Sequence, residues 1–259
     1  MLMPVLRFPD PEDADPSGIV AIGGDLHPTT LLRAYRAGIF PWPMPGLPLT
    51  WFSPDPRAVL FFDEVHVGKR LARTRRLSGL RLTIDSAFDD VIRHCAEVPR
   101  PDQPGASLQP EAAPEGDEGE PYNGETVAEP RTWITPEVLR AYCEFHRLGH
   151  AHSCEAWDGD RLVGGLYGVD VDWAFAGESM FRLEPDASKL ALLHLIDHLR
   201  ARGLEWIDIQ VMTPHMKAMG AREIPRRKYL ELLAETRARG VRSFSSCRAA
   251  ASPPRRHRG

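Results

Sequence analysis

The sequence predicts an α+β protein with a small N-terminal domain and a larger domain built on a mixed sheet. Three observations support this prediction. The first 64 residues are rich in Gly and Pro, which is typical of a compact unit dominated by loops. Residues 152–176 alternate between β-prone segments and turn signals, which is typical of antiparallel strands. Residues 187–211 resemble a helix followed by a buried strand, which adds a parallel crossover.

The N-terminal segment predicts one short helix from about Thr29 to Arg36, which ends before Gly38. Two proline-rich stretches follow, FPWPMPGLP at 40–48 and SPDPR at 53–57. Proline fixes its own backbone and removes a donor, so these stretches favour loops. We therefore divide the chain into a small N-terminal domain at 1–64, a larger domain at 65–240 and a basic flexible tail at 241–259.

Two further helices are expected on either side of an acidic stretch. Asp85 can cap the first, in which apolar residues recur at helical spacing from Ala87 to Cys95. The second begins at Thr135 and ends at Gly149. Between them, residues 102–129 contain eight acidic and no basic residues among Pro, Gly and Ala, which predicts a disordered insertion. Without it the chain has a net charge of +4 rather than −4.

The larger domain continues with a hairpin at Asp158-Gly159, a helix over Ala187–Arg202 and a buried strand over Glu205–Val211. Asp208 and Gln210 lie two residues apart on that strand, so both are expected on one face. Buried polar groups without partners cost about 1–3 kcal/mol each. A functional site would supply partners, and so would a structural hydrogen-bonded pair at a sheet edge.

Several classes of protein are excluded or disfavoured. No apolar run approaches the roughly 20 residues that a membrane helix needs, and the first residues lack the pattern of a signal peptide. The four cysteines include no C-x-x-C pair, so reduced thiols and a cytoplasmic location are expected. Neither G-x-x-x-x-G-K-[ST] nor G-x-G-x-x-G occurs, which argues against nucleotide triphosphatases and dinucleotide oxidoreductases.

Basic residues gather in two regions. Residues 66–81 contain no acid and hold six cations, Lys69, Arg70, Arg73, Arg75, Arg76 and Arg81. From Arg222 to the end, eleven Lys and Arg accompany three Glu. Such clusters indicate a polyanionic partner such as RNA, and a solvated helix face with a frayed tail explains the charge equally well.

Short motifs leave alternatives open. Ser179 is not the nucleophile of an esterase elbow, because Phe181 stands where that motif needs glycine. Glu178 could belong to a site or cap a helix. His150 and His152 have metal-binding spacing, but no third ligand supports it, so we expect core or surface histidines and no metal. Trp42 and Trp133 could stack on bases or serve packing alone.

Ten segments together resemble the leucyl/phenylalanyl-tRNA–protein transferase family. They occur in the family's order and cover nearly the whole chain outside the acidic insertion and the tail: GGDL, YRAGIFPW, WFSPDPRAVL, TWIT, LGHAHSCEAW, LVGGLYGV, FAGESMF, ASK, IDIQ and GAREIPRRKYL. The resemblance implies that the larger domain has an N-acetyltransferase-like (GNAT-type) fold.

The resemblance also implies an activity. Leucine, or phenylalanine, would move from charged tRNA to the α-amine of proteins that begin with Arg or Lys, which marks them for N-degron proteolysis. The partners would be aminoacyl-tRNA and those acceptor proteins, and the protein would act as a monomer. No cofactor is expected, because the aminoacyl ester supplies the driving force.

Individual residues match the family's functional positions. Trp42 and Trp133 would position the terminal adenosine of the tRNA. The side-chain pocket would consist of Leu166, Phe175, Leu195 and Ile207, and phosphate contacts would come from Lys69, Arg70, Arg73, Arg75 and Arg76. The polar catalytic positions match Glu178, Asp208 and Gln210. Leu166 and Ala176 depart from the family's frequent Met and Cys, which could shift the preference between Leu and Phe.

In one account Asp208 polarises Gln210, which then helps to deprotonate the amine. In the other, the tRNA's own groups move the proton and these residues orient the reactants; a neutral amide is a very weak base, which favours orientation. Two other classes compete. An acyl-CoA-dependent N-acetyltransferase should have a glycine-containing pyrophosphate loop, which FRLEPDAS at 181–188 lacks. A tRNA-binding protein without chemistry would not need Asp208 and Gln210 beside an apolar pocket.

Overall fold

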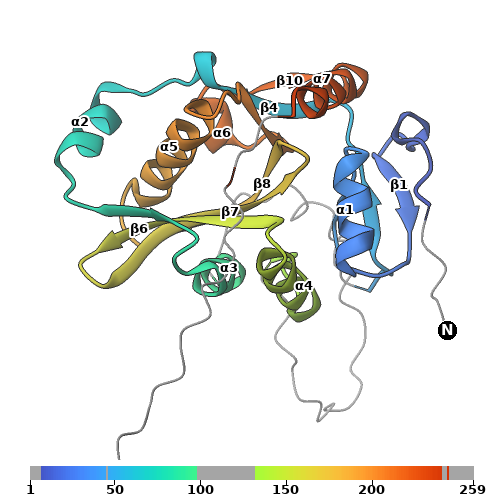
Figure 1. The fold of residues 1–259 in the computed structure, drawn as a ribbon, viewed down its shortest axis with the longest axis horizontal. Coiled ribbons are helices and arrows are strands. Elements are labelled where there is room, and N and C mark those ends of the chain that lie inside the picture. The colour runs from blue at the N-terminus through green and yellow to red at the C-terminus, as the bar shows by residue number, and fades with distance from the viewer. Residues whose placement is uncertain (1–6, 45, 98–131, 241–243, 245–259) are drawn as a thin grey trace, which may run out of the picture.

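The computed structural model describes residues 7–44, 46–97, 132–240 and 244. The predicted insertion at 102–129 and all of the predicted tail except Phe244 lie outside this part of the chain. The described residues form two β-sheets and their covering helices, so the predicted α+β class is confirmed (Figure 1). Within these residues no helix combines the length and apolar character needed to cross a bilayer.

The smaller sheet is antiparallel and has the strand order β1-β3-β2. Its elements are the 3-10 helix η1 (Pro11–Asp13), β1 (Ile19–Ile22), α1 (Pro28–Arg36), β2 (Phe40–Pro41) and β3 (Thr50–Phe52). Helix α1 confirms the predicted helix to within one residue, and Gly38 follows it with φ of 73°. A Cβ at Gly38 would lie 2.7 Å from a methyl carbon of Leu230, so glycine also allows the C-terminal helix to approach.

The larger sheet has the order β10-β4-β9-β8-β7-β6-β5. Its strands are β4 (Arg57–Phe61), β5 (Arg81–Ile84), β6 (Ala151–Asp158), β7 (Arg161–Val171), β8 (Ala174–Arg182), β9 (Trp206–Gln210) and β10 (Arg222–Ile224). The predicted β6–β7 hairpin is confirmed, and its turn consists of Gly159 and Asp160, one position later than predicted. Strands β8 and β9 are parallel, which confirms the predicted crossover through the intervening helix.

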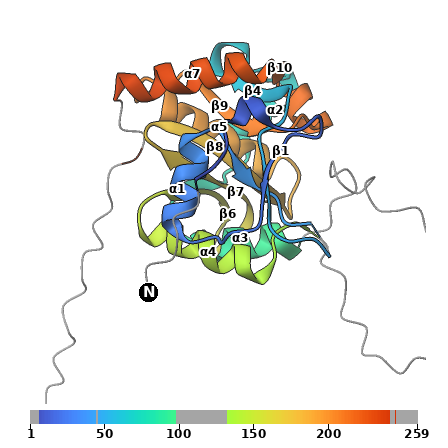
Figure 2. The same ribbon diagram turned by 90° about the vertical axis from the view of Figure 1, so that its right-hand side faces the viewer.

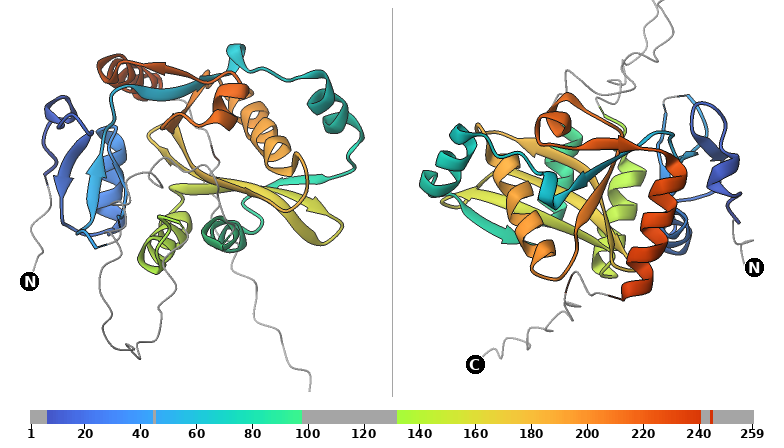
Figure 3. Two further views of the ribbon diagram at one scale, coloured as in Figure 1. Left: turned by 180° about the vertical axis from the view of Figure 1, so that it is seen from behind. Right: turned by 90° about the horizontal axis from the view of Figure 1, so that it is seen from above.

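The helices of this larger unit are α2 (Lys69–Leu77), α3 (Phe88–Glu97), α4 (Pro136–Arg147), α5 (Ala187–Arg200), α6 (Pro214–Ala218) and α7 (Arg226–Arg239), with the 3-10 helix η2 at Phe62–Glu64. Helix α5 covers one face of the β6–β7 region, whereas α3 and α4 cover the other (Figures 1 and 2). Seen from above, α2 and the small sheet lie at opposite ends, with α5 and α7 between them (Figure 3).

The structure bears on the predicted domain division at residue 64, and it corrects the predicted cap of α3. Strand β4 precedes the predicted boundary at residue 64 but pairs with β9 and β10 in the larger sheet, because its apolar side chains Val59 and Leu60 are fully buried there. The division at residue 64 stays a proposal, and β4, which precedes residue 64, belongs to the larger sheet. Asp85 does not cap α3; its carboxylate instead accepts hydrogen bonds from the backbone N–H of Ser153 and from His152.

Candidate active site

A cavity of about 590 Å³ lies between α5 and strands β8 and β9, with walls also from β7 and α6. Two tryptophans from outside these elements, Trp42 after β2 and Trp133 before α4, complete its lining. It is mostly apolar, with a few polar side chains from β8, β9 and the start of α5. Such a cavity, with few convergent polar groups, is the usual form of a small-ligand site.

Trp42 and Trp133 are neighbours although 91 residues separate them in the sequence. Their ring centroids lie 6.2 Å apart with an interplanar angle of 30°, and both rings are half-buried and line the cavity. Phe40 and Phe52 pack against Trp42 from the small sheet. The pair thus forms one supported aromatic surface on which a planar ligand group can stack.

The four residues predicted to form an apolar pocket all line this cavity: Leu166, Phe175, Leu195 and Ile207. None is more than 4% exposed. They come from β7, β8, α5 and β9, and they belong to the apolar core that α5 forms with the sheet. Because α5 and the strands hold these side chains in a packed core, the pocket has a fixed shape that can select a side chain by size.

Glu178 lies on β8 and lines the same cavity with a buried carboxyl group. Its Oε1 accepts hydrogen bonds of 2.7 Å from the hydroxyl of Tyr35 and from the side-chain amide of Gln210. Tyr142 extends the network through its hydroxyl contact with Tyr35. Burial raises the pKa of Glu178 to about 8, although the hydrogen bond from Tyr35 opposes this shift. Its Oε2 is buried and has no hydrogen-bond partner among the described residues.

Asp208 pairs with a fully buried arginine. Arg57 donates from Nε to Oδ1 at 2.8 Å and from Nη2 to Oδ2 at 2.6 Å, and the Tyr229 hydroxyl donates to Oδ2 at 2.9 Å. Burial lowers the pKa of the Arg57 guanidinium, but the groups around it, above all the negatively charged Asp208 carboxylate, raise it by more, so the pKa is raised overall. Asp208 itself does not line the cavity. It lies behind the cavity wall in a closed, bidentate ion pair.

Gln210 departs from the predicted strand geometry. The β4–β9 pairing shifts register between Ala58 and Val59, and Gln210 has φ of 64°, a left-handed conformation that is uncommon for residues other than glycine. The Oδ1 of Asp208 accepts the backbone N–H of Gln210 at 2.9 Å and so stabilises this turn. The expectation that both side chains share one face by simple alternation is therefore wrong: Gln210 lines the cavity and Asp208 does not.

Five of the six cations of the first basic cluster lie on α2, at the far end of the molecule from the small sheet (Figure 3). The sixth, Arg81, begins β5 and lies over the ring of Trp157. Arg75 pairs with Asp197 and Arg70 with Asp186, which itself lines the cavity. The other three cations of α2, Lys69, Arg73 and Arg76, are exposed, and no ion pair is formed by them within the described residues. The structure therefore links α2 to the cavity through Arg70 and leaves three cations facing solvent.

The second basic cluster is largely engaged within the fold. Arg226 is buried and donates to the backbone carbonyl of Ser53. Arg237 pairs with Asp172 and Arg239 with Glu205. The basic residues after Gly240 lie outside the described part of the chain. This cluster thus offers less free charge than its composition suggests.

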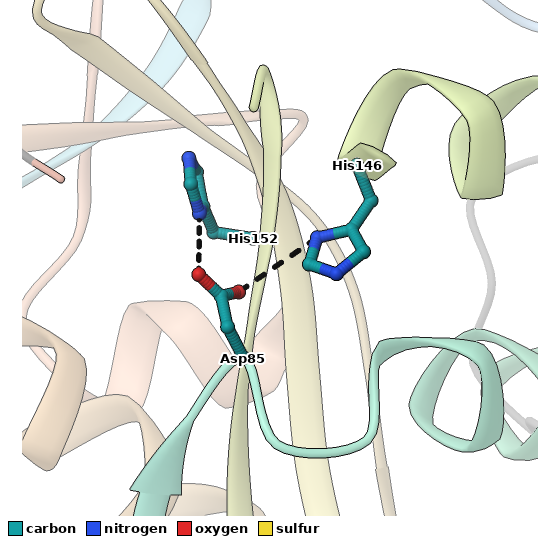
Figure 4. A group of neighbouring side chains, drawn as sticks. All are labelled: Asp85, His146 and His152. Carbon is teal, nitrogen blue, oxygen red and sulfur yellow. Dashed lines mark hydrogen bonds and ion pairs between the residues drawn. The ribbon is translucent and has the colours of Figure 1, made fainter. Parts of the chain in front are cut away.

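Within the part of the chain that the structure describes, Asp85, His146 and His152 form a group that could hold a metal ion (Figure 4). The Nδ1 atoms of His152 and His146 lie 2.7 and 3.9 Å from the Asp85 carboxylate. However, Nδ1 of His146 also lies 2.7 Å from the carbonyl oxygen of Ala151, a distance at which it must donate a hydrogen. A nitrogen that carries a hydrogen cannot ligate a metal, so the geometry fits a hydrogen-bonded cluster. His150, which has H-x-H spacing with His152, is not a member of this group.

Sequence reasoning missed four site residues, Arg57, Tyr229, Tyr35 and Tyr142, although the first three lie in the segments that carry the family resemblance. One signal was available: Arg57 opens the apolar run RAVLFF, and a buried cation requires a carboxylate partner. The tyrosines gave no comparable signal, because tyrosines at such positions commonly serve packing alone. The cations Arg182 and Lys189, which also line the cavity, were likewise not predicted.

Comparison with known families gives a consistent result. The family model described as leucyl/phenylalanyl-tRNA protein transferase matches residues 59–114 and 123–234, and the model for the N-terminal domain of the same family matches residues 24–55. The match is interrupted within the predicted insertion and ends before the tail.

Curated relatives carry the name leucyl/phenylalanyl-tRNA–protein transferase. Those from Anaeromyxobacter dehalogenans and Nitratidesulfovibrio vulgaris are 47% identical to this chain, covering 90% and 87% of it and 91% and 86% of their own lengths. The Myxococcus xanthus relative is 43% identical over 95% of this chain and 94% of its own. A solved C-terminal domain of a putative lysylphosphatidylglycerol synthetase from Agrobacterium fabrum aligns at a TM-score of 0.33 and 13% identity over 74% of this chain and 55% of that one, which supports no assignment.

Proposed function

Because this chain belongs to the leucyl/phenylalanyl-tRNA–protein transferase family, an aminoacyltransferase family that uses charged tRNA, we propose that it transfers leucine, and also phenylalanine, to proteins that begin with Arg or Lys. The modified proteins would enter N-degron proteolysis in the cytoplasm. One observation supports this proposal most strongly: a single cavity is lined by the tryptophan pair, the apolar pocket and the Glu178–Gln210 pair. An aminoacyl-adenosine presents the three matching parts, a base, an apolar side chain and an ester.

Trp42 and Trp133 receive the terminal adenine by stacking. A base stacked on an aromatic side chain contributes about 1–3 kcal/mol, which suffices to fix the end of a flexible single strand. Trp42 is packed against Phe40 and Phe52, and Trp133 lies beside Trp42, so the pair needs little ordering when the base arrives. The exposed cations of α2, Lys69, Arg73 and Arg76, with Arg70 and Arg75, contact phosphates of the acceptor arm.

The amino-acid side chain enters the pocket of Leu166, Phe175, Leu195 and Ile207. The four residues are apolar, so shape and desolvation set the choice, and each methylene changes the discrimination by about 1–3 kcal/mol. Leu and Phe share an unbranched Cβ, which suits a narrow entrance. Both are therefore substrates, in a ratio that depends on the depth of the pocket.

The reaction itself is the attack of an amine on an ester. The amine nitrogen bonds to the carbonyl carbon, the bond to the ribose oxygen breaks, and the proton lost by the amine is gained by that oxygen. Among the described residues the side-chain amide of Gln210 has one partner, Glu178, so its carbonyl oxygen remains available to accept from the amine. Gln210 thereby orients the nucleophile, in line with the weak basicity of a neutral amide.

Asp208 acts through Gln210 and is a positioning residue. Its oxygens are occupied by Arg57, Tyr229 and the backbone N–H of Gln210, so it holds the turn that presents Gln210. Glu178 offers its free Oε2 to the incoming acceptor. A cationic group placed against this carboxyl would favour its ionised form and lower its pKa. Glu178 would thus bind the acceptor electrostatically once that group arrives.

We further propose that the larger unit has the acetyltransferase-like architecture that the resemblance implies. The parallel β8–α5–β9 crossover beside the cavity supports it. No glycine lies at the start of α5 to admit a pyrophosphate, which sets this site apart from acyl-CoA enzymes.

The test incubates the purified full chain with radiolabelled leucyl-tRNA or phenylalanyl-tRNA and peptides that begin with Arg, Lys or Ala. We expect label on the α-amine of the Arg and Lys peptides and none on the Ala peptide. Labelled acetyl-CoA, offered in parallel, should give no product. Acetylation without aminoacyl transfer would instead identify an N-acetyltransferase, and tRNA binding without any transfer would identify a binding protein.

A further inference from the structure

Phe244 lies in an aromatic niche behind the apolar pocket. Its ring stacks on His152, with centroids 3.7 Å apart and an interplanar angle of 4°. It also lies 5.0 Å from the ring of His198 and 5.7 Å from that of Phe175. These three rings come from β6, α5 and β8. A residue from the predicted tail thus packs into the core that α5 forms with the sheet.

Phe175 is the link between this niche and the cavity. It is 1% exposed, and it lines the cavity together with Leu195 and Ile207. A Cβ at Gly168 would lie 2.5 Å from two carbons of the Phe175 ring, so the backbone of β7 blocks movement in that direction. Phe244 does not line the cavity and touches Phe175 from elsewhere. It therefore packs against the Phe175 ring on a side that does not face the cavity and limits movement of that ring in its own direction.

The imidazole of His152, on which Phe244 stacks, is itself held in place. His152 is buried, and its Nδ1 lies 2.7 Å from the Asp85 carboxylate. A dashed line marks this contact in Figure 4. This hydrogen bond fixes the plane of the imidazole on which Phe244 stacks. The Nε2 of His152 is buried and unpartnered within the described residues, so the ring contributes to Phe244 mainly as a flat packing surface.

We propose that Phe244 is a specificity-determining residue that braces Phe175 and thereby sets the depth of the amino-acid pocket. The inference rests on the proposed function of that pocket. Phe244 lies beyond residue 234, where the match to the family model ends. When the Phe244 ring is removed, the Phe175 ring can relax into the space that it leaves. The pocket then deepens, which loosens the fit of Leu and relieves the fit of the larger Phe.

The experiment compares full-length wild type with Phe244→Ala and Phe244→Leu. The value of kcat/KM is measured for leucyl-tRNA and for phenylalanyl-tRNA with one Arg-initiated peptide. We expect Phe244→Ala to lower the Leu-to-Phe ratio by about 5-fold or more, within the range that a small change in an apolar pocket produces. Phe244→Leu, which keeps an apolar brace, should restore most of the wild-type ratio.

Phe8→Ala is the matched control, because Phe8 is an aromatic side chain packed on Trp51 in the small sheet, away from the pocket. It should lower the melting temperature without changing the ratio. If Phe244→Ala also lowers the melting temperature and leaves the ratio unchanged, Phe244 has only a structural role and the inference is overturned. A wild-type protein that transfers neither amino acid would overturn the proposed function, and the inference with it.

Discussion

Glu178 and Gln210 show how single residues acquire function from their surroundings. Neither a glutamate nor a glutamine is unusual in a strand, but here both are buried against a cavity and bonded to each other at 2.7 Å. Burial raises the pKa of Glu178 to about 8, so the carboxyl group is mostly protonated near neutral pH. It can therefore persist without a fixed cation beside it and ionise when one arrives.

This raised pKa predicts a pH dependence of stability. The folded-state pKa of Glu178 lies above its ordinary value of 4.5, so its contribution is fully present below that value and is lost as pH rises through about 8. Glu178→Gln should remove this loss. The free energy of unfolding, measured with denaturant at about pH 5 and about pH 8.5, should fall by at least about 1 kcal/mol more in the wild type than in the variant. One pKa unit corresponds to about 1.4 kcal/mol. Equal losses in both proteins would refute the raised pKa.

Gln210→Ala and Asp208→Ala should differ in their effects. Gln210→Ala should lower kcat by about 10- to 100-fold and change the affinity for charged tRNA less than about threefold, since Gln210 orients the amine. Asp208→Ala should lower kcat similarly, and it should also reduce the free energy of unfolding by about 3–5 kcal/mol, because Arg57 would remain buried and unpaired. Single-turnover rates, tRNA binding and denaturant unfolding separate these effects. Weaker tRNA binding with normal turnover of bound tRNA would contradict the assigned roles.

At the scale of elements, periodicity and turn chemistry predicted the helices α1 and α5 and the β6–β7 hairpin, since each depends on local sequence. Two details could not be predicted locally. The irregular pairing of β9 depends on β4, which lies about 150 residues away in the sequence. Asp85 was expected to cap α3, but its carboxylate instead accepts a hydrogen bond from the backbone N–H of Ser153 on β6.

Helix α2 provides the prediction at this scale. The double substitution Arg73→Ala and Arg76→Ala removes two exposed cations that form no ion pair within the described residues. It should raise the KM for charged tRNA several-fold. It should also reduce the salt slope of log(kcat/KM) by about one to two, since each phosphate contact contributes about 0.7–0.9.

The matched control replaces Arg93 and Arg140 by alanine. Both are exposed helical arginines on α3 and α4, and both are paired only within their own helix. Their replacement changes the net charge by the same amount as the α2 double substitution and leaves α2 unchanged. If the control and the α2 variant show the same salt slope, α2 does not contact the tRNA.

At the scale of the whole molecule, the site joins segments that are remote in sequence. Trp42 from the small sheet meets Trp133, and Arg57 from β4 meets Asp208 from β9. Residue types and family resemblance indicated most of these residues individually. Only the three-dimensional structure shows that Asp208 lies behind the wall while Gln210 lines it, because that distinction follows from one bulge and one ion pair.

The predicted insertion allows a test on the whole chain. Deletion of residues 102–129, with a short Gly/Ser bridge, should leave the fold and leucyl transfer largely intact, because its composition cannot bury enough apolar surface to offset an ordering entropy of roughly 1–2 kcal/mol per residue. Loss of eight negative charges should leave tRNA affinity equal or slightly tighter at low salt. A soluble deletion variant that binds tRNA markedly more weakly would show that this segment contributes to the site.

The most direct test of the account is a crystal structure with a non-hydrolysable 3′-leucylamido-adenosine. The account predicts that its adenine stacks on the surface formed by Trp42 and Trp133. It also predicts that the leucine side chain lies among Leu166, Phe175, Leu195 and Ile207, with the amide carbonyl near Gln210. Electron density for the ligand outside this cavity, or a leucine side chain directed away from Phe175, would contradict the central claim that one cavity binds both parts of the aminoacyl-tRNA end.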